Sequence, residues 1–163
     1  MSKVLVFIFD GMTDYEITLI THLLGSDAGK EIITIAYEDK IIKSSSGLLY
    51  KPVRLVADVL HEDAEGLIIC GAGTVFLAKA GVLKDVKYTT PIVEWTQKHI
   101  EVFGEKDPFS RENFVSKRVV RDGNVITAQG IAFIDFAIEI CNWFDLFADQ
   151  EDRDNFAKNI KGL

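Results

Sequence analysis

Short apolar runs alternate with segments of helical spacing along most of the chain. Val4–Phe9 is a continuous β-branched and aromatic run of strand length, which is typical of a parallel strand buried on both faces. The segment 13–16, Thr-Asp-Tyr-Glu, has the form of a capping box and precedes apolar residues at helical spacing, with Gly25 expected to end the helix. Glu31–Tyr37 is predicted to form a second strand. The opening therefore predicts a β-α-β unit in a parallel sheet.

The rest of the chain predicts further elements of both kinds. The strands that we expect are a hairpin over 41–50 that turns at 45–47, a core strand over Leu67–Ile69 and a hairpin of 115–120 with 125–128. Two shorter helices are expected, a compact one over Thr74–Ala80 ended by Gly81 and one with Pro91 in its first turn that runs through Trp95 and His99. An apolar helix over 133–144 and a charged helix over 149–160 follow. No repeat, low-complexity tract or linker interrupts this pattern. We predict one α/β domain over residues 1–163.

Composition narrows the kind of protein. The chain has 163 residues, of which 48% are hydrophobic, enough for a sizeable core. Its 18 Lys and Arg against 25 Asp and Glu give a net charge of −7, which argues against nucleic acid as a partner. No apolar run approaches the roughly 18 residues of a membrane span, and the N-terminus lacks a signal-peptide pattern. Two cysteines far apart do not suggest a disulfide framework, so we expect a cytoplasmic protein without membrane contact.

Cys70 is the strongest candidate for chemistry. It lies where a buried strand meets a helix, and the Gly-x-Gly at 71–73 permits a sharp turn of the kind that exposes a nucleophile. Such a turn puts the side chain at the carboxyl edge of the sheet, where open α/β folds bind ligands. The helix N-terminus is expected to lower the pKa of the thiol. The alternative is a buried structural cysteine, which is how we interpret Cys141 on the last apolar helix.

A thiol nucleophile usually needs a base or an orienting partner. Glu16 is the best placed, because it opens the helix after the first strand, on the same sheet edge as Cys70. A carboxylic acid with a raised pKa could donate a hydrogen bond or carry protons there. Its alternative role is to close the capping box with Thr13. The histidines are poorly placed for this task, namely His22, His61 and His99.

Two further kinds of site are disfavoured. Phe76 stands where a dinucleotide-binding Gly-x-Gly-x-x-Gly motif has its third glycine. No cluster of His, Cys, Asp and Glu has the spacing of a zinc site. We therefore expect neither a cofactor nor a metal.

Three segments of the chain carry the motifs of a known family. They are the strand with Asp-Gly-Met-Thr-Asp-Tyr-Glu at 4–16, the Cys-Gly-Ala-Gly elbow with its helix and Lys-Tyr-Thr-Thr at 70–90, and Val-Ile-Thr-Ala-Gln-Gly with its helix at 125–140. Together they resemble the ThiJ/PfpI family, relatives of the Parkinsonism-associated deglycase. The resemblance implies a flavodoxin-like three-layer α/β sandwich with a mostly parallel sheet, in the class I glutamine amidotransferase-like superfamily, usually homodimeric.

The resemblance also implies roles for particular residues. Cys70 is the expected nucleophile and Glu16 its carboxylic-acid partner. The positions expected to form the oxyanion site or line the pocket are Gly71, Ala72, Gln129 and Gly130.

The chain departs from the family pattern in three places. The family has a Pro-Gly-Gly-type turn, a helix and another strand before the cysteine, whereas here Leu67–Ile69 runs directly into Cys70. A strand-helix-strand segment of about 30 residues is thus absent near 69/70, and with it a source of oxyanion-site N–H groups. Either the unit is deleted or the sequence joins across a segment of a longer chain, and we favour the second. Gly71 and Pro91 stand where family histidines are often found, and residues 129–132 replace a more glycine-rich turn.

Three hypotheses for the function follow from these residues together with the resemblance. The leading hypothesis is a glyoxalase-like or deglycase-like hydrolase or lyase acting on small carbonyl compounds, in which Cys70 forms a hemithioacetal and Glu16 moves the proton. The first alternative is an intracellular cysteine amidase or peptidase, with His99 or a second subunit supplying the base. The second is a non-enzymatic redox or stress sensor in which Cys70 becomes a sulfinate. The expected partners are a small-molecule substrate and a second copy of the chain.

Overall fold

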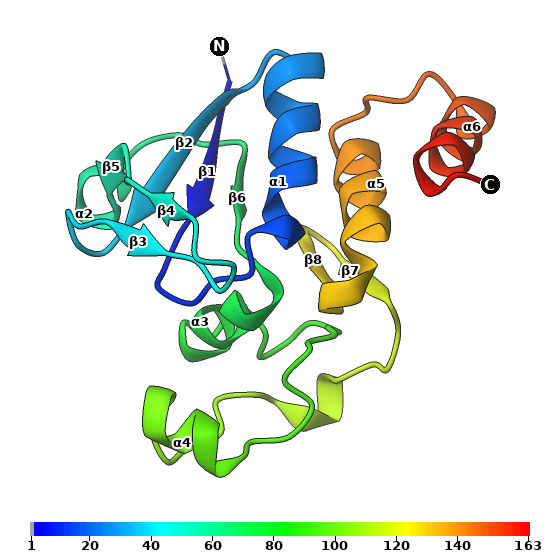
Figure 1. Ribbon diagram of the computed structural model, residues 1–163. Coiled ribbons are helices and arrows are strands. Elements are labelled where there is room, and N and C mark those ends of the chain that lie inside the picture. The colour runs from blue at the N-terminus through cyan, green and yellow to red at the C-terminus, as the bar shows by residue number, and fades with distance from the viewer. Residues whose placement is uncertain (1) are drawn as a thin grey trace.

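The computed structural model of this chain describes residues 2–163 and is built around a four-stranded parallel sheet (Figure 1). The strand order is β5-β2-β1-β6, and each neighbouring pair runs parallel. Two small antiparallel pairs lie outside this sheet, β3 with β4 and β7 with β8. The strands are β1 (Lys3–Phe7), β2 (Glu31–Ala36), β3 (Ile42–Lys43), β4 (Leu49–Tyr50), β5 (Arg54–Leu55), β6 (Gly66–Ile68), β7 (Val119–Asp122) and β8 (Val125–Ala128).

Six helices lie between or after these strands in the part of the chain that the structure describes. They are α1 (Tyr15–His22), α2 (Val56–Val59), α3 (Thr74–Lys79), α4 (Gln97–Phe103), α5 (Phe133–Trp143) and α6 (Gln150–Lys161). Four short turns join them, the π-helical η1 (Leu23–Asp27) and the 3-10 turns η2 (Gly71–Gly73), η3 (Arg111–Asn113) and η4 (Gly130–Ala132). Within residues 2–163, none of the helices combines the length and the apolar character that crossing a bilayer requires.

Helices cover both faces of the sheet and make three layers. On one face α1 and α5 pack on β1 through an apolar cluster that includes Val6, Ile20 and Ala137. On the other face α2 and α3 contribute Val59 and Phe76, which pack on the alternate side chains of β1 and β2. Both faces of β1 are therefore buried, which explains its uninterrupted apolar sequence. The predicted α/β sandwich with a mostly parallel sheet is confirmed.

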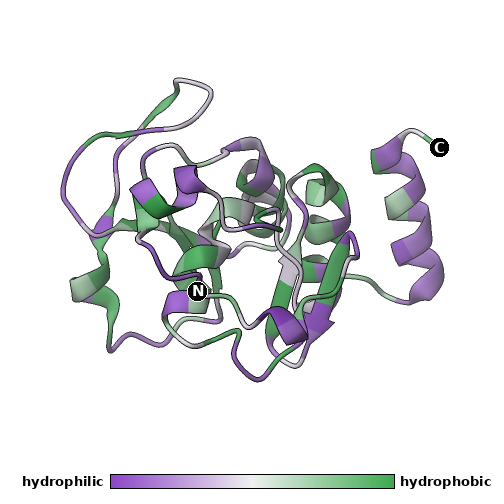
Figure 2. Ribbon diagram, turned by 90° about the horizontal axis from the view of Figure 1, so that it is seen from below, coloured by the Kyte–Doolittle hydropathy of each residue, from purple (hydrophilic) through white to green (hydrophobic). Residues whose placement is uncertain are grey.

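The terminal helix α6 lies outside α5 (Figure 1). Figure 2 shows mostly hydrophilic residues along it, as its charged sequence predicts. Asp149 caps it by accepting a hydrogen bond from the backbone of its first turn. Arg153 reaches Glu139 of α5 at 3.4 Å, and the ring of Phe156 packs on Phe147 with 5.4 Å between centroids. The predicted charged helix is thus present and attached through a few side chains.

Both predicted hairpins form, the second with shifted boundaries. The first, β3 with β4, turns at Gly47, whose φ is +91°. The second begins at Val119 rather than Val115. The reason is that the Val115 N–H donates to the carbonyl of Tyr88 at 2.8 Å, which draws that residue away from the hairpin.

Two predicted helix boundaries are wrong. Gly25 does not end the first helix, because the chain continues through η1 and turns at Gly29, with a φ of +61°. Pro91 does not open a helix, because α4 begins only after Thr96. There the ring of His99 accepts a hydrogen bond from the Thr96 N–H at 3.1 Å and closes the first turn.

A buried carboxylate attaches the β3–β4 hairpin to the start of α1. Asp14 is 5% exposed and accepts hydrogen bonds from Ser46 Oγ at 2.6 Å, Ser44 Oγ at 2.8 Å and Tyr50 OH at 3.1 Å. These hydroxyl donors, Ser46 foremost, hold the pKa of Asp14 below its ordinary value although burial opposes them. Because Asp14 is the residue before α1, its hydrogen bonds to the hairpin fix the start of that helix and the position of Glu16 in its first turn.

Replacing Asp14 with Asn should lower the free energy of unfolding by about 1–3 kcal/mol, because a neutral amide attracts the three hydroxyl donors less strongly. Since the folded pKa of Asp14 is lowered, its contribution is complete above the ordinary carboxyl pKa and is lost as pH falls through the folded value. Urea unfolding at pH 7 and at pH values below the ordinary carboxyl pKa of about 3.9 measures both effects. The exposed Asp63 provides the control, and an equal loss in Asp63→Asn would contradict this interpretation.

Candidate active site

The segment from Cys70 to Thr74 forms a sharp strand-to-helix elbow after β6. Cys70 is extended, with a φ of −64° and a ψ of 163°, and η2 follows it at once and leads into α3. The Gly73 N–H donates to the Cys70 carbonyl at 2.8 Å. A Cβ on Gly73 would overlap the side chain of Ile69, so the turn needs glycine there. The elbow predicted from the order strand, cysteine, Gly-x-Gly and helix is present.

Glu16 reaches this elbow from the first turn of α1. The residue is 8% exposed, and its carboxylate accepts a hydrogen bond from the Gly71 N–H. Burial raises the pKa of Glu16, and the hydrogen bond from Gly71 opposes that rise only in part. The predicted capping box is wrong, because Asp14 is the N-cap residue and the Glu16 backbone N–H, not its side chain, meets Thr13. The side chain bridges two distant segments instead.

Two glycines leave room for the Glu16 carboxylate. A Cβ on Gly71 would lie 3.0 Å from Glu16 Oε2 and 3.2 Å from Pro91 Cγ. A Cβ on Gly130 would overlap Glu16 Oε1. Neither glycine has a positive φ, so the constraint is space rather than backbone conformation. Both positions, which the resemblance assigns to the oxyanion site or the pocket lining, lie against the Glu16 carboxylate.

A chain of hydrogen bonds links the elbow to Gln129. Thr74 Oγ1 donates to the Gly71 carbonyl at 2.8 Å and lies 2.7 Å from Thr90 Oγ1. Gln129 Nε2 donates to Thr89 Oγ1 at 2.8 Å and to the Thr90 carbonyl at 3.0 Å. Neither Thr74 nor Thr90 is among the site residues that the sequence predicts. The signal that could have found Thr74 is a hydroxyl residue at the first position of the helix after the elbow.

Cys70 is more enclosed than the sequence predicts. Cys70 is 2% exposed, and this burial raises the pKa of its thiol. The Thr13 N–H opposes this rise, the charge of Glu16 adds to it, and the N–H groups of Gly73 and Ala72 oppose it. The expectation of a lowered pKa is wrong, because loss of water disfavours the thiolate more than these N–H groups favour it.

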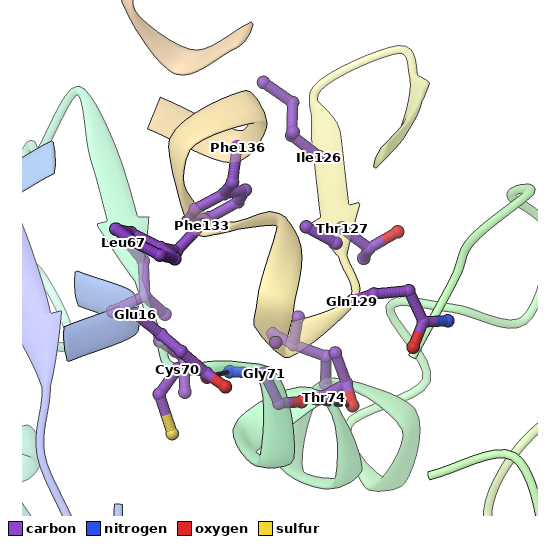
Figure 3. A pocket seen from close by; sticks show the side chains of 14 residues that line it. Glu16, Leu67, Cys70, Gly71, Thr74, Ile126, Thr127, Gln129, Phe133 and Phe136 are labelled. Atoms are coloured by element: carbon purple, nitrogen blue, oxygen red, sulfur yellow. Dashed lines mark hydrogen bonds between the residues drawn. The ribbon is translucent and has the colours of Figure 1, made fainter. Parts of the chain in front are cut away.

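A cavity, here called the elbow cavity, opens between β6, β8 and the start of α5 (Figure 3). Polar side chains gather at one end and apolar ones at the other, and Cys70 turns away from the apolar end. The lining residues are Glu16, Leu67, Ile69, Cys70, Gly71, Thr74, Leu77, Ile126, Thr127, Ala128, Gln129, Gly130, Phe133 and Phe136. Of the residues expected to line the pocket, Ala72 is not among them, because its side chain packs against the apolar core.

The histidines lie outside the elbow cavity. The ring of His99 closes the first turn of α4 and stacks on Trp95 with 5.4 Å between centroids. Among residues 2–163, no group of three or more His, Cys, Asp and Glu side chains is arranged to hold a metal ion. The groups that the structure brings together at the elbow are therefore one thiol, one carboxylic acid and several backbone N–H groups.

These features define a flavodoxin-like α/β protein whose elbow carries a cysteine beside a buried carboxylic acid. The chain belongs to the DJ-1/PfpI family, whose family model matches residues 2–72 and 68–142. The resemblance that the sequence motifs indicated is confirmed.

Known proteins agree with this assignment. The chain is 25% identical over 189 aligned positions to a Bacillus subtilis protein named "Uncharacterized protease YoaZ", with 90% of this chain and 85% of that protein covered. A DJ-1 superfamily protein from Agrobacterium tumefaciens has a TM-score of 0.74 at 21% identity, covering 98% of this chain and 99% of the other. The oxidized DJ-1 of Toxoplasma gondii has a TM-score of 0.72 at 18% identity, covering 98% of both chains. At this identity the two structures support the fold.

Gly130→Ala should lower the free energy of unfolding by about 1–3 kcal/mol, because the added methyl group displaces the Glu16 carboxylate. Adding Glu16→Ala should recover part of that loss, and a double-mutant cycle by urea unfolding measures the recovery. Gly66→Ala is the matched control, since its Cβ would meet only Phe144 Cζ at an ordinary 3.6 Å. Additive losses in the double variant would contradict the proposed overlap.

Both thiols should react slowly with iodoacetamide at pH 7, because burial raises both pKa values, that of Cys141 to about 11. Glu16→Gln should shift the titration of Cys70 to lower pH, since it removes a negative charge while an amide oxygen can still accept the Gly71 N–H. Labelling rates against pH, resolved for each cysteine by mass spectrometry, test this, with Cys141 as the internal control. An unchanged Cys70 profile in the variant would show that the Glu16 charge does not act on the thiol.

Proposed function

We propose that this protein is a cofactor-free cysteine enzyme that acts on small carbonyl compounds such as 2-oxoaldehydes. Cys70 is the nucleophile and Glu16 carries the proton. The observation that carries the proposal is that both residues line the elbow cavity and meet at Gly71. Two free cysteines support a cytoplasmic setting, and the family resemblance supports a homodimer.

The first step is the addition of the thiol to an aldehyde. The Cys70 sulfur forms a bond to the carbonyl carbon while the carbon–oxygen π bond opens. The thiol proton passes to the Glu16 carboxylate, which returns it to the former carbonyl oxygen. The product is a hemithioacetal, and no oxidant or reductant is consumed.

The electrostatics of the elbow suit this route. A raised pKa keeps the Cys70 thiol protonated until it reacts. The raised pKa of Glu16 makes its carboxylate a better proton acceptor. Transfer of the proton between the two groups as the sulfur–carbon bond forms avoids a separate charged thiolate on a sulfur whose residue is only 2% exposed.

The elbow cavity favours a small substrate. Its polar end holds Glu16, Thr74 and Gln129, which suit a carbonyl and a neighbouring hydroxyl or oxo group. Its other end holds Phe133 and Phe136, which suit a short apolar substituent. The peptidase hypothesis has less support, because it needs a histidine base and the histidines lie outside the cavity.

One observation favours a second candidate, a redox sensor. The N–H groups of Thr13, Ala72 and Gly73 all favour negative charge on the Cys70 sulfur. Oxidation of this thiol by a peroxide, which is reduced to water or an alcohol, would yield a sulfinate after two such steps. The same N–H groups would stabilise that anion.

Turnover of methylglyoxal by the purified protein tests the proposal. Cys70→Ala should abolish it, Glu16→Gln should lower it by about 10²- to 10⁴-fold, and Cys141→Ala should leave it unchanged. Activity that survives in Cys70→Ala would contradict the assignment of the nucleophile. Absence of turnover, together with a gain of two oxygen atoms on Cys70 after peroxide treatment, would favour the sensor.

A further inference from the structure

The peptide group between Gly71 and Ala72 has a partner on each side. Its carbonyl accepts a hydrogen bond from Thr74 Oγ1 at 2.8 Å. Its N–H, on Ala72, is among the backbone groups that favour negative charge on the Cys70 sulfur. Figure 3 shows Thr74 beside Gly71, at the start of the helix that follows the elbow. A group bonded to this carbonyl therefore acts on the same peptide that faces the thiol.

The hydroxyl groups behind Thr74 form a chain with a single direction. A hydroxyl donates one hydrogen, and that of Thr74 goes to the Gly71 carbonyl. Thr90 Oγ1, which lies 2.7 Å from Thr74 Oγ1, must therefore be the donor of that pair. Thr90 Oγ1 in turn accepts from the Ile92 N–H at 3.1 Å. The chain thus runs from the Ile92 N–H through two hydroxyls to the Gly71 carbonyl, with every hydrogen directed toward the elbow.

The end of β8 and the residue after it hold Thr90 in place. Gln129 Nε2 donates to the Thr90 carbonyl at 3.0 Å and to Thr89 Oγ1 at 2.8 Å. The Thr89 N–H donates to Thr127 Oγ1, on β8, at 2.9 Å. Thr90 is fully buried, so its hydroxyl has no competition from water for Thr74. The chain is therefore part of the packed structure rather than a surface contact.

Hydrogen bonds in series polarise one another, and burial strengthens the effect. Each donor of the chain makes the Gly71 carbonyl more negative and the Ala72 N–H more positive. The sulfur of Cys70 carries more negative charge as it loses its proton during carbonyl addition, and also in a sulfinate. A more strongly polarised Ala72 N–H therefore favours either reaction of this thiol.

A threonine can also bond to a nearby carbonyl of its own helix with only a local effect. Thr21 does so in α1, where its Oγ1 donates to the Thr18 carbonyl at 3.0 Å in an exposed bond. Thr74 makes the same three-residue contact but differs in two respects. Its oxygen is paired with a second hydroxyl, and its carbonyl partner belongs to the peptide beside the reactive thiol. Thr21 is therefore a matched control.

We propose that Thr74 and Thr90 are positioning residues for Cys70, because their hydroxyl chain holds and polarises the Gly71–Ala72 peptide and so supports negative charge on the sulfur as it reacts. This inference rests on the proposed function only in taking Cys70 as the reacting group. The two hydroxyls act on the sulfur through this peptide, and Gln129 keeps Thr90 within reach of Thr74.

The rate of Cys70 labelling by iodoacetamide against pH tests the proposal. Thr74→Val removes the hydroxyl at nearly constant volume, so it should shift the Cys70 titration to higher pH and slow labelling by about two- to fivefold at lower pH. Thr90→Val, one step further back, should give a smaller shift in the same direction. Thr74→Ser keeps the hydroxyl and should keep the original profile, as should Thr21→Val.

Each other outcome overturns the proposal. Unchanged Cys70 profiles in Thr74→Val and Thr90→Val would show that the chain does not act on the thiol. An equal shift in Thr74→Ser, or a parallel change at Cys141, would show altered packing rather than loss of a hydroxyl. If Thr74→Val does not fold, Thr90→Val against Thr21→Val decides the question. Because labelling needs no turnover, failure of the proposed carbonyl chemistry leaves these results interpretable.

Discussion

The arrangement of the elbow depends on one hydrogen bond, from the Gly71 N–H to the Glu16 carboxylate. It joins the first turn of α1 to the turn after β6, two segments 55 positions apart in sequence. The bond forms only because the backbone of Gly71 and Gly130 leaves space on both sides of the carboxylate. The Asp14 cluster supports it from the other direction, since it fixes the start of the helix that carries Glu16. The hairpin, helix α1 and the elbow together therefore fix the position of the Glu16 carboxylate.

Burial has opposite consequences for the two reactive groups. It raises the pKa of Glu16 and so strengthens the carboxylate as a base, and it raises the pKa of Cys70 and so weakens the thiol as an acid. A free thiolate is therefore disfavoured, and proton transfer coupled to bond formation is the route that this environment allows. The N–H groups around the sulfur lower the cost of negative charge without removing it. Because the same N–H groups would stabilise a sulfinate, oxidation of Cys70 competes with its addition to a carbonyl.

Elements specified by local pattern could be predicted from the sequence, whereas those set by distant packing could not. The apolar run of β1, the elbow at Cys70 and the charged α6 each follow from adjacent residues. Parallel topology predicts that Glu16 lies at the same edge of the sheet as Cys70. The hydrogen bond from the Gly71 N–H to the Glu16 carboxylate, however, depends on contacts between distant segments. The same holds for Pro91, which packs near Gly71 instead of opening a helix. The raised pKa of Cys70 could not be predicted from the sequence, because burial of the thiol is a property of the whole fold.

The position of Cys70 just after β6 leaves its thiol enclosed although it borders a cavity. The elbow cavity lies between β6 and β8, yet the thiol that should serve it is 2% exposed and turned away from its apolar end. Residues 68–72 match both the end of one family block and the start of the next, so one short segment here stands for two. Ile68 pairs with Val6 of β1, and two residues later the Cys70 sulfur is buried where the Thr13 N–H reaches it.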